Sequence, residues 1–154
     1  MKKIIITILV FVIFNSLFGQ CNTSLCKSDT LHLKGIEFIL SIPQDKKYKR
    51  TIDYYEEGVY AYYAFADSAL LLFQNGGMVD IPFYRAYPQN HLVETYENDT
   101  SIVYSGFIDQ KYFKEIFDKK TRSTIMCLFV NENDINYYND IMNKVFIHYS
   151  LTKK

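Results

Sequence analysis

The 154-residue sequence has no tryptophan, no net charge and no second long apolar run after its first 19 residues. The missing basic excess excludes nucleic-acid binding by bulk charge. The missing second run excludes a multi-span membrane protein. The absence of tryptophan also argues against a carbohydrate-stacking platform. With 14 tyrosines and 12 phenylalanines, the chain is too apolar and aromatic for a disordered protein, so we expect a folded domain.

Motifs that carry chemistry are also missing. The sequence contains no G-x-S-x-G elbow, no Gly-rich phosphate loop, no G-x-G-x-x-G and no H-E-x-x-H. His32, His91 and His148 lie far apart in sequence, without the spacing typical of a metal site, so neither a metal nor a cofactor is expected. No C-x-x-C occurs, which leaves thioredoxin-like and zinc-ribbon readings without support. These absences favour a non-enzymatic protein.

The N-terminus has the three-part pattern of a secretory signal peptide. Lys2 and Lys3 precede an apolar run over 4–14, and Gly19 is small enough to stand before the cleavage site. The apolar stretch is shorter than the roughly 20 residues that span a bilayer. We therefore predict a signal peptide over 1–19 and export to the periplasm or the extracellular space. The remaining chain carries 15 basic and 17 acidic side chains, a net charge of −2.

The cysteines leave two arrangements open. A lipoprotein anchored to the outer membrane through Cys21 is the alternative to a soluble mature form, but Gln20 stands where the lipidation motif needs a small residue. Lipidation would leave Cys26 and Cys127 to pair. Without it, Cys21 and Cys26 can close a small disulfide loop in the oxidising compartment, and Cys127 stays a free core thiol. We favour a soluble protein with a Cys21–Cys26 disulfide.

Hydrophobic patterning predicts one domain over 35–150, preceded by a flexible lead-in over 20–34. Strict alternation of apolar residues indicates strands, whereas a continuous apolar β-rich run indicates a central strand covered on both faces. Polar and Gly-rich or Pro-rich stretches indicate loops, including a turn at Asn75-Gly76-Gly77. The expected strands are 35–42, the two strands of a hairpin over 59–74, 78–81, 102–108 and a central strand over 125–130. The expected loops are 44–50 and a long connection over 82–100, and this connection contains a short helix at 91–96.

The clearest helix follows Asn131, which can cap it. Its apolar stripe has helical spacing and is formed by Ile135, Tyr138, Ile141, Met142 and Val145. Residues 112–117 fit either a helix or a strand. The expected fold class is therefore α+β, a mainly antiparallel sheet with a C-terminal helix packed on it.

Several short segments occur in a characteristic order. They are Phe38-Ile39-Leu40-Ser41-Ile42-Pro43, the Asp67-Ser68 hairpin, 102–106 and Tyr112-Phe113-Lys114-Glu115-Ile116, followed by a final strand and helix. In this order of elements the chain resembles the PsbP-like α+β sandwich family. The resemblance spans about residues 35–147. It implies that residues 111–118 form a strand, and it implies no single activity, because this fold hosts many functions.

Tyrosine is the informative excess. Tyr60 and Tyr62 fall on one face of their predicted strand, and Arg85, Tyr87 and His91 lie on the long connection. Tyrosine combines a large contact area with a polar tip, so these five residues are the candidate binding patch for a protein partner in the bacterial envelope. Core filling is the competing explanation for the tyrosines. The alternative functions are an immunity-type inhibitor of a periplasmic toxin and a small hydrolase with a site near His91.

Overall fold

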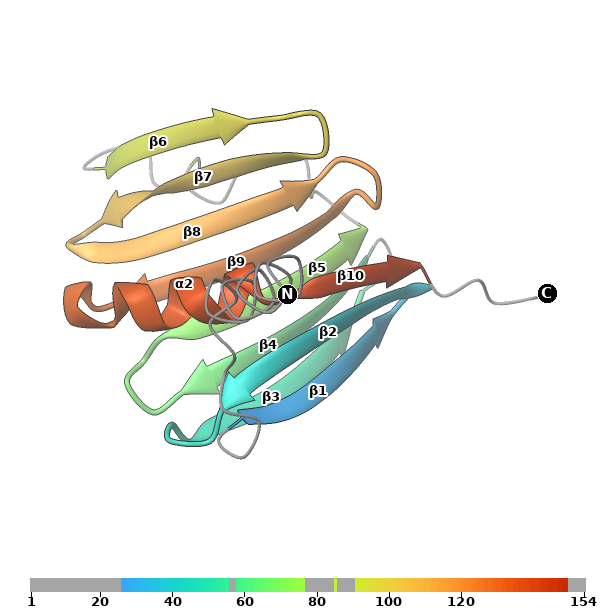
Figure 1. Cartoon of the computed structure of the whole chain (residues 1–154), viewed down its shortest axis with the longest axis horizontal. Coiled ribbons are helices and arrows are strands. Elements are labelled where there is room, and N and C mark those ends of the chain that lie inside the picture. The colour runs from blue at the N-terminus through green and yellow to red at the C-terminus, as the bar shows by residue number, and fades with distance from the viewer. Residues whose placement is uncertain (1–25, 56–57, 77–84, 86–90, 150–154) are drawn as a thin grey trace, which may run out of the picture.

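Two antiparallel β-sheets and a helix make up the part of the chain that the computed structural model describes, residues 26–55, 58–76, 85 and 91–149 (Figure 1). The small sheet has the strand order β1 (Cys26–Leu33), β2 (Ile36–Pro43), β10 (Phe146–Tyr149). The large sheet has the order β3 (Tyr48–Tyr54), β4 (Gly58–Phe65), β5 (Leu70–Gly76), β9 (Ser123–Val130), β8 (Lys111–Asp118), β7 (Ser101–Ile108), β6 (His91–Glu97). A 3₁₀ turn, η2 (Glu132–Asp134), leads into helix α2 (Ile135–Asn143). The predicted α+β class, with a C-terminal helix on antiparallel sheets, is confirmed.

The small sheet and α2 pack on the same face of the large sheet, and both lie in front of it in Figure 1. We call this face the core face. Alternate residues of β2, β4 and β5 point into the core between the layers, where the rings of Phe38 and Phe73 meet edge to face at 5.2 Å. The opposite face of the large sheet, here the outer face, carries the intervening residues. Within the described residues, no helix or strand packs on the outer face, although this face holds a second cluster of buried side chains, Ile108, Phe113, Met126 and Leu128.

The strongly patterned segments fold as the sequence predicts. The hairpin over 59–74 is formed by β4 and β5, and the strand over 102–108 lies within β7. The apolar segment 125–130 lies in β9, the middle strand of the large sheet, and is buried except at Phe129. The ambiguous segment 112–117 is strand β8, because both of its edges pair with neighbours, β7 on one side and β9 on the other.

The predicted lead-in over 20–34 is corrected, since residues 26–33 form β1. Every residue of β1 lies in register with β2, from Cys26 opposite Pro43 to Leu33 opposite Ile36. Leu31 and Leu33 are buried in the core, and the residues between and before them are exposed or half-buried. Burial of these two leucines, together with the ladder to β2, holds this segment in the domain.

Two further local predictions are wrong. The segment 44–50, expected as a loop, already contains the start of β3, whose residues pair with β4 from Tyr48 onward. The short helix expected at 91–96 is strand β6, paired with β7 along its whole length. The turn between β6 and β7 explains this outcome, because the Asn98 side chain accepts hydrogen bonds from the backbone N–H groups of Thr100 and Ser101 and so closes a hairpin.

The remaining corrections concern Asn75, the start of α2 and the segment that follows α2. Asn75, expected in a turn, is a buried strand residue whose side-chain amide donates to the Leu33 carbonyl at 2.7 Å. Asn131 makes no side-chain cap, and α2 begins only at Ile135. Val145 lies beyond the helix, and the chain continues into the unpredicted strand β10. The predicted strand at 78–81 and the signal peptide lie outside the described residues. In the described part of the chain, no helix has the length and apolar character needed to cross a membrane.

Candidate functional site: the tyrosine surface of the outer face

Tyr60 and Tyr62 lie on the outer face of β4, as their alternation with buried Val59, Ala61 and Tyr63 predicts. Because side chains alternate along a strand, the same strand supplies a core tyrosine and two outer tyrosines. Both outer tyrosines are half-buried. Within this strand, the core-filling explanation therefore holds for Tyr63 and not for its two neighbours.

Contacts with adjacent strands fix the position of Tyr60. The side-chain amide of Gln74 on β5 donates to its hydroxyl at 3.1 Å and to the Gly76 carbonyl at 3.2 Å. The ring of Tyr55 packs edge to face against the ring of Tyr60, with ring centroids 5.0 Å apart and an interplanar angle of 86°. Tyr55 itself is 59% exposed. We call Tyr55, Tyr60 and Tyr62 the tyrosine surface.

The surroundings of the tyrosine surface mix polar and apolar groups. On β3, Asp53 lies opposite Tyr60 and Thr51 opposite Tyr62, and on β5 Leu72 lies on the other side of Tyr62. Carboxylate, hydroxyl and aliphatic groups thus alternate with phenol rings across three strands. Such a mixture suits a contact that combines ring burial with hydrogen bonds at its rim.

Of the other three predicted binding residues, the structure describes Arg85 and the backbone of His91, and neither joins the tyrosine surface. Arg85 is exposed, and no described contact links it to Tyr60 or Tyr62. Tyr87 lies outside the described residues. His91 begins β6, the opposite edge of the large sheet, which puts its backbone about 24 Å from β4 at five strand spacings. The structure brings together two of the five predicted residues.

The cysteines bear on the choice between the two predicted arrangements. Cys26 is disulfide-bonded, whereas Cys127 carries a free, buried thiol. Burial raises the pKa of the Cys127 thiol to about 12. The Cys26–Cys127 pairing is therefore excluded. Cys21 lies outside the described residues, so its pairing with Cys26 stays a prediction.

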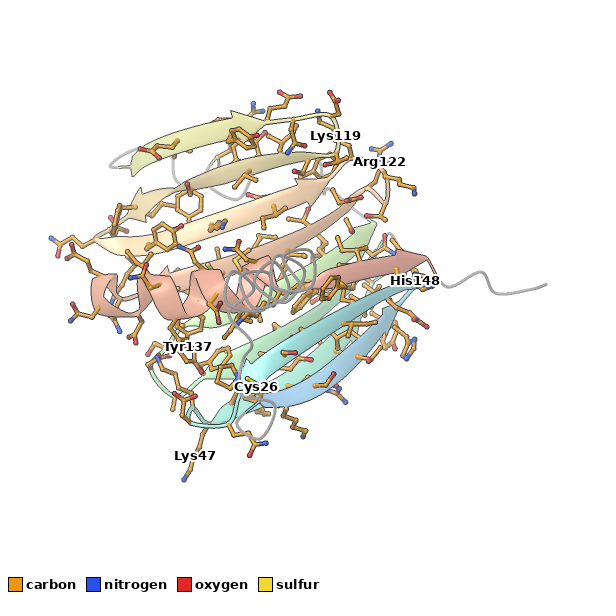
Figure 2. All side chains as sticks on the ribbon, viewed as in Figure 1. Cys26, Lys47, Lys119, Arg122, Tyr137 and His148 are labelled. Carbon is orange, nitrogen blue, oxygen red and sulfur yellow. The ribbon has the colours of Figure 1, made fainter. Side chains whose placement is uncertain are left out.

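Two histidines lie on either side of Glu37 on the small sheet. His32 on β1 and His148 on β10 both lie opposite Glu37 on β2, so the three residues form one row across the exposed side of this sheet. The Nδ1 atom of His32 lies 3.1 Å from Oε1 of Glu37. Figure 2 places His148 on the strand that runs to the C-terminal end of the described chain. The described residues contain no cluster of His, Cys, Asp or Glu that could hold a metal ion.

A polar network that sequence reasoning missed joins three segments at one end of the molecule. Lys46 Nζ, between β2 and β3, donates to Asp67 in the β4–β5 turn at 2.5 Å and to Asp134 in η2 at 2.9 Å. It also lies over the rings of Tyr137 and Tyr138 at 4.6 and 5.0 Å from their centroids. Figure 2 shows Tyr137 at this end, away from Lys119 and Arg122 at the β8–β9 turn.

The ammonium of Lys46 forms ion pairs with the carboxylates of Asp67 and Asp134. Burial acts to raise the pKa of Asp67, but hydrogen bonds from Lys46, Tyr138 and the Ala69 amide outweigh it and lower the pKa below its usual 3.8. For Lys46, burial acts to lower the pKa, and the bonds to the two carboxylates raise it instead. The network therefore anchors α2 to the large sheet, and we assign it no ligand.

Comparisons with protein-family models, with curated proteins and with solved structures find no match to this chain. The resemblance to PsbP-like proteins stays a prediction.

Proposed function

We propose that this protein is an exported, non-enzymatic binding protein that contacts a protein partner of the bacterial envelope through the tyrosine surface. One observation carries the proposal. Tyr60 and Tyr62 are aligned on the face of the large sheet opposite the core, and exposed Tyr55 extends the phenol surface beyond them. Export rests on the signal-peptide pattern of residues 1–19, and the non-enzymatic role rests on the missing catalytic motifs.

Energetic reasoning supports tyrosine as the contact residue. Phenol rings bury a large area at low cost in side-chain entropy, because only two torsions become fixed. Tyr60 is held by Gln74 and Tyr55 before any partner arrives, so little further ordering is needed on binding. Truncation of such anchors removes binding free energy out of proportion to the lost area.

The test is affinity capture from native envelope extract with tagged protein, followed by mass spectrometry. The wild-type protein is compared with the double variant Tyr60→Ala/Tyr62→Ala and with the matched control Tyr96→Ala, an exposed tyrosine of β6. We expect a partner that wild type and control retain and that the double variant loses by about tenfold or more. Thermal unfolding of each variant verifies that the fold is intact.

Two outcomes would contradict the proposal. Equal capture by the double variant would remove the tyrosine surface as the contact. No partner above background, with wild-type protein shown to be folded, would remove protein binding itself.

A further inference from the structure

Lys114 is a half-buried cation in the middle of β8, on the core face of the large sheet. Its ammonium donates to the Asn143 Oδ1 of α2 at 3.2 Å. Across the described part of the chain, no carboxylate lies within ion-pair distance of it. Burial lowers its pKa, the reverse of Lys46, whose two carboxylates raise it. Cys127, its neighbour on β9, holds a neutral thiol at pH 7 and supplies no counter-charge.

Neutral hydrogen-bonding groups surround the ammonium. Tyr112 precedes Lys114 by two residues, so both side chains lie on the same face of β8. The Tyr112 hydroxyl donates to the Oδ1 of Asn139 at 3.3 Å. Ser105 lies opposite Lys114 on β7. Asn139 and Asn143 are one turn apart on α2 and therefore share a helix face. Two polar residues of β8, Tyr112 and Lys114, are thus paired with two asparagines of α2, Asn139 and Asn143.

Donor capacity in this cluster exceeds what the described residues use. An ammonium has three N–H groups, and the described contacts of Lys114 account for one. The amides of Asn139 and Asn143 serve as acceptors, and neither donates its NH₂ group to another described residue. Asn143 is exposed and Asn139 is half-buried, so solvent reaches this cluster. The half-buried ammonium and the two amide donors beside it match the two oxygen atoms of a carboxylate.

Two neighbours narrow the chemistry of the ligand. Glu94 on β6 lies opposite Ser105, in the same row as Lys114, and its negative charge disfavours a dianion next to a single ammonium. Phe107, 36% exposed, packs its ring against Tyr112 with centroids 5.7 Å apart. An apolar surface therefore lies beside the donors. A monocarboxylate with an aromatic or aliphatic body fits both features.

We propose that Lys114, Asn139 and Asn143 bind the carboxylate of a small apolar monocarboxylic acid, whose body rests on Phe107. This site lies on the core face, beside α2, and is separate from the tyrosine surface.

The test is an NMR titration of isotopically labelled protein with benzoate at constant ionic strength, with chloride as the compensating anion. We expect saturable shifts of the Lys114, Asn139 and Asn143 signals. In Lys114→Met the dissociation constant should rise about tenfold or more, whereas Lys111→Met, on the same strand and exposed, should leave it unchanged. Bound benzoate should also raise the pKa of Lys114, because a carboxylate favours the charged amine.

The outcomes decide the proposal in either direction. Shifts that stay linear to roughly 100 mM benzoate, or equal affinity in Lys114→Met, would overturn it. Saturable binding of inorganic phosphate without benzoate binding would overturn the carboxylate assignment. If Lys114→Met does not fold, Asn143→Leu decides instead, since it keeps the ammonium and removes one amide; a weaker affinity for benzoate supports the site, and an unchanged affinity rejects it.

Discussion

The Tyr138 hydroxyl donates a hydrogen bond to the Asp67 carboxylate at 2.9 Å, across 71 positions of sequence. This contact joins the buried face of α2 to the turn between β4 and β5. The Tyr138 ring also packs edge to face on Phe65 with centroids 5.2 Å apart. The same carboxylate accepts from Lys46 and from the Ala69 amide. Asp67 is thus the point at which helix, loop and hairpin are connected.

Replacement of Asp67 should therefore destabilise the domain. In Asp67→Asn, Lys46 loses one of its two carboxylates and Tyr138 loses a charged acceptor, so we expect a loss of about 1–3 kcal/mol in the free energy of unfolding. Chemical denaturation measures it. Asp140→Asn is the matched control, since Asp140 forms an exposed i,i+4 pair with Lys144 and should change stability by less than about 0.5 kcal/mol. Equal losses in both variants would reject the anchoring role.

The stabilising effect of Asp67 should depend on pH. Its folded-state pKa lies below the usual 3.8 because Lys46, Tyr138 and the Ala69 amide favour the carboxylate over the opposing effect of burial. A lowered pKa means that the contribution is fully present above pH 3.8 and is lost as the pH falls through the folded value. Denaturation of wild type and Asp67→Asn across this range should show the difference between them shrinking in acid. A difference that grows in acid would contradict the assignment.

The strands that the sequence predicted and those it missed differ in their place in the sheets. β2, β4, β7 and β9 have neighbours on both sides, and their alternating or continuous apolar patterns are strong. The four strands that were missed or misassigned, β1, β3, β6 and β10, are the edges of the two sheets. Edge strands carry polar and charged residues that prevent pairing with other chains, which weakens the hydrophobic signal.

The parts of the candidate site that depend on local strand geometry could be predicted from the sequence, whereas those that depend on long-range contacts could not. The alternation of β4 predicted that Tyr60 and Tyr62 share a face, because this depends only on local geometry. The network of Lys46 with Asp134, 88 positions away, has no local signal. The same holds for the pairing of Lys114 with Asn143, which requires the order of strands and the position of α2.

Residues 26–33, which belong to the flexible lead-in predicted over 20–34, should instead be required for stability. Leu33→Ala removes a fully buried side chain of β1 and should cost about 2–5 kcal/mol. Thr30→Ala, on the exposed side of the same strand, is the matched control and should cost less than about 1 kcal/mol. Urea denaturation of both variants measures the difference. A Leu33→Ala protein as stable as the control would restore the lead-in interpretation.

Cys127 should be unreactive in the folded protein. Its thiol is fully buried among core residues, and burial raises its pKa to about 12, so the thiol stays protonated at pH 7. The thiolate is the reacting form, so labelling by a thiol reagent should proceed only as fast as the core opens. Mass spectrometry after timed exposure to iodoacetamide, with and without denaturant, measures this. Rapid modification of Cys127 under conditions in which the protein stays folded would contradict this prediction. It would show that the reagent reaches β9 from the core face and that α2 packs loosely over this strand.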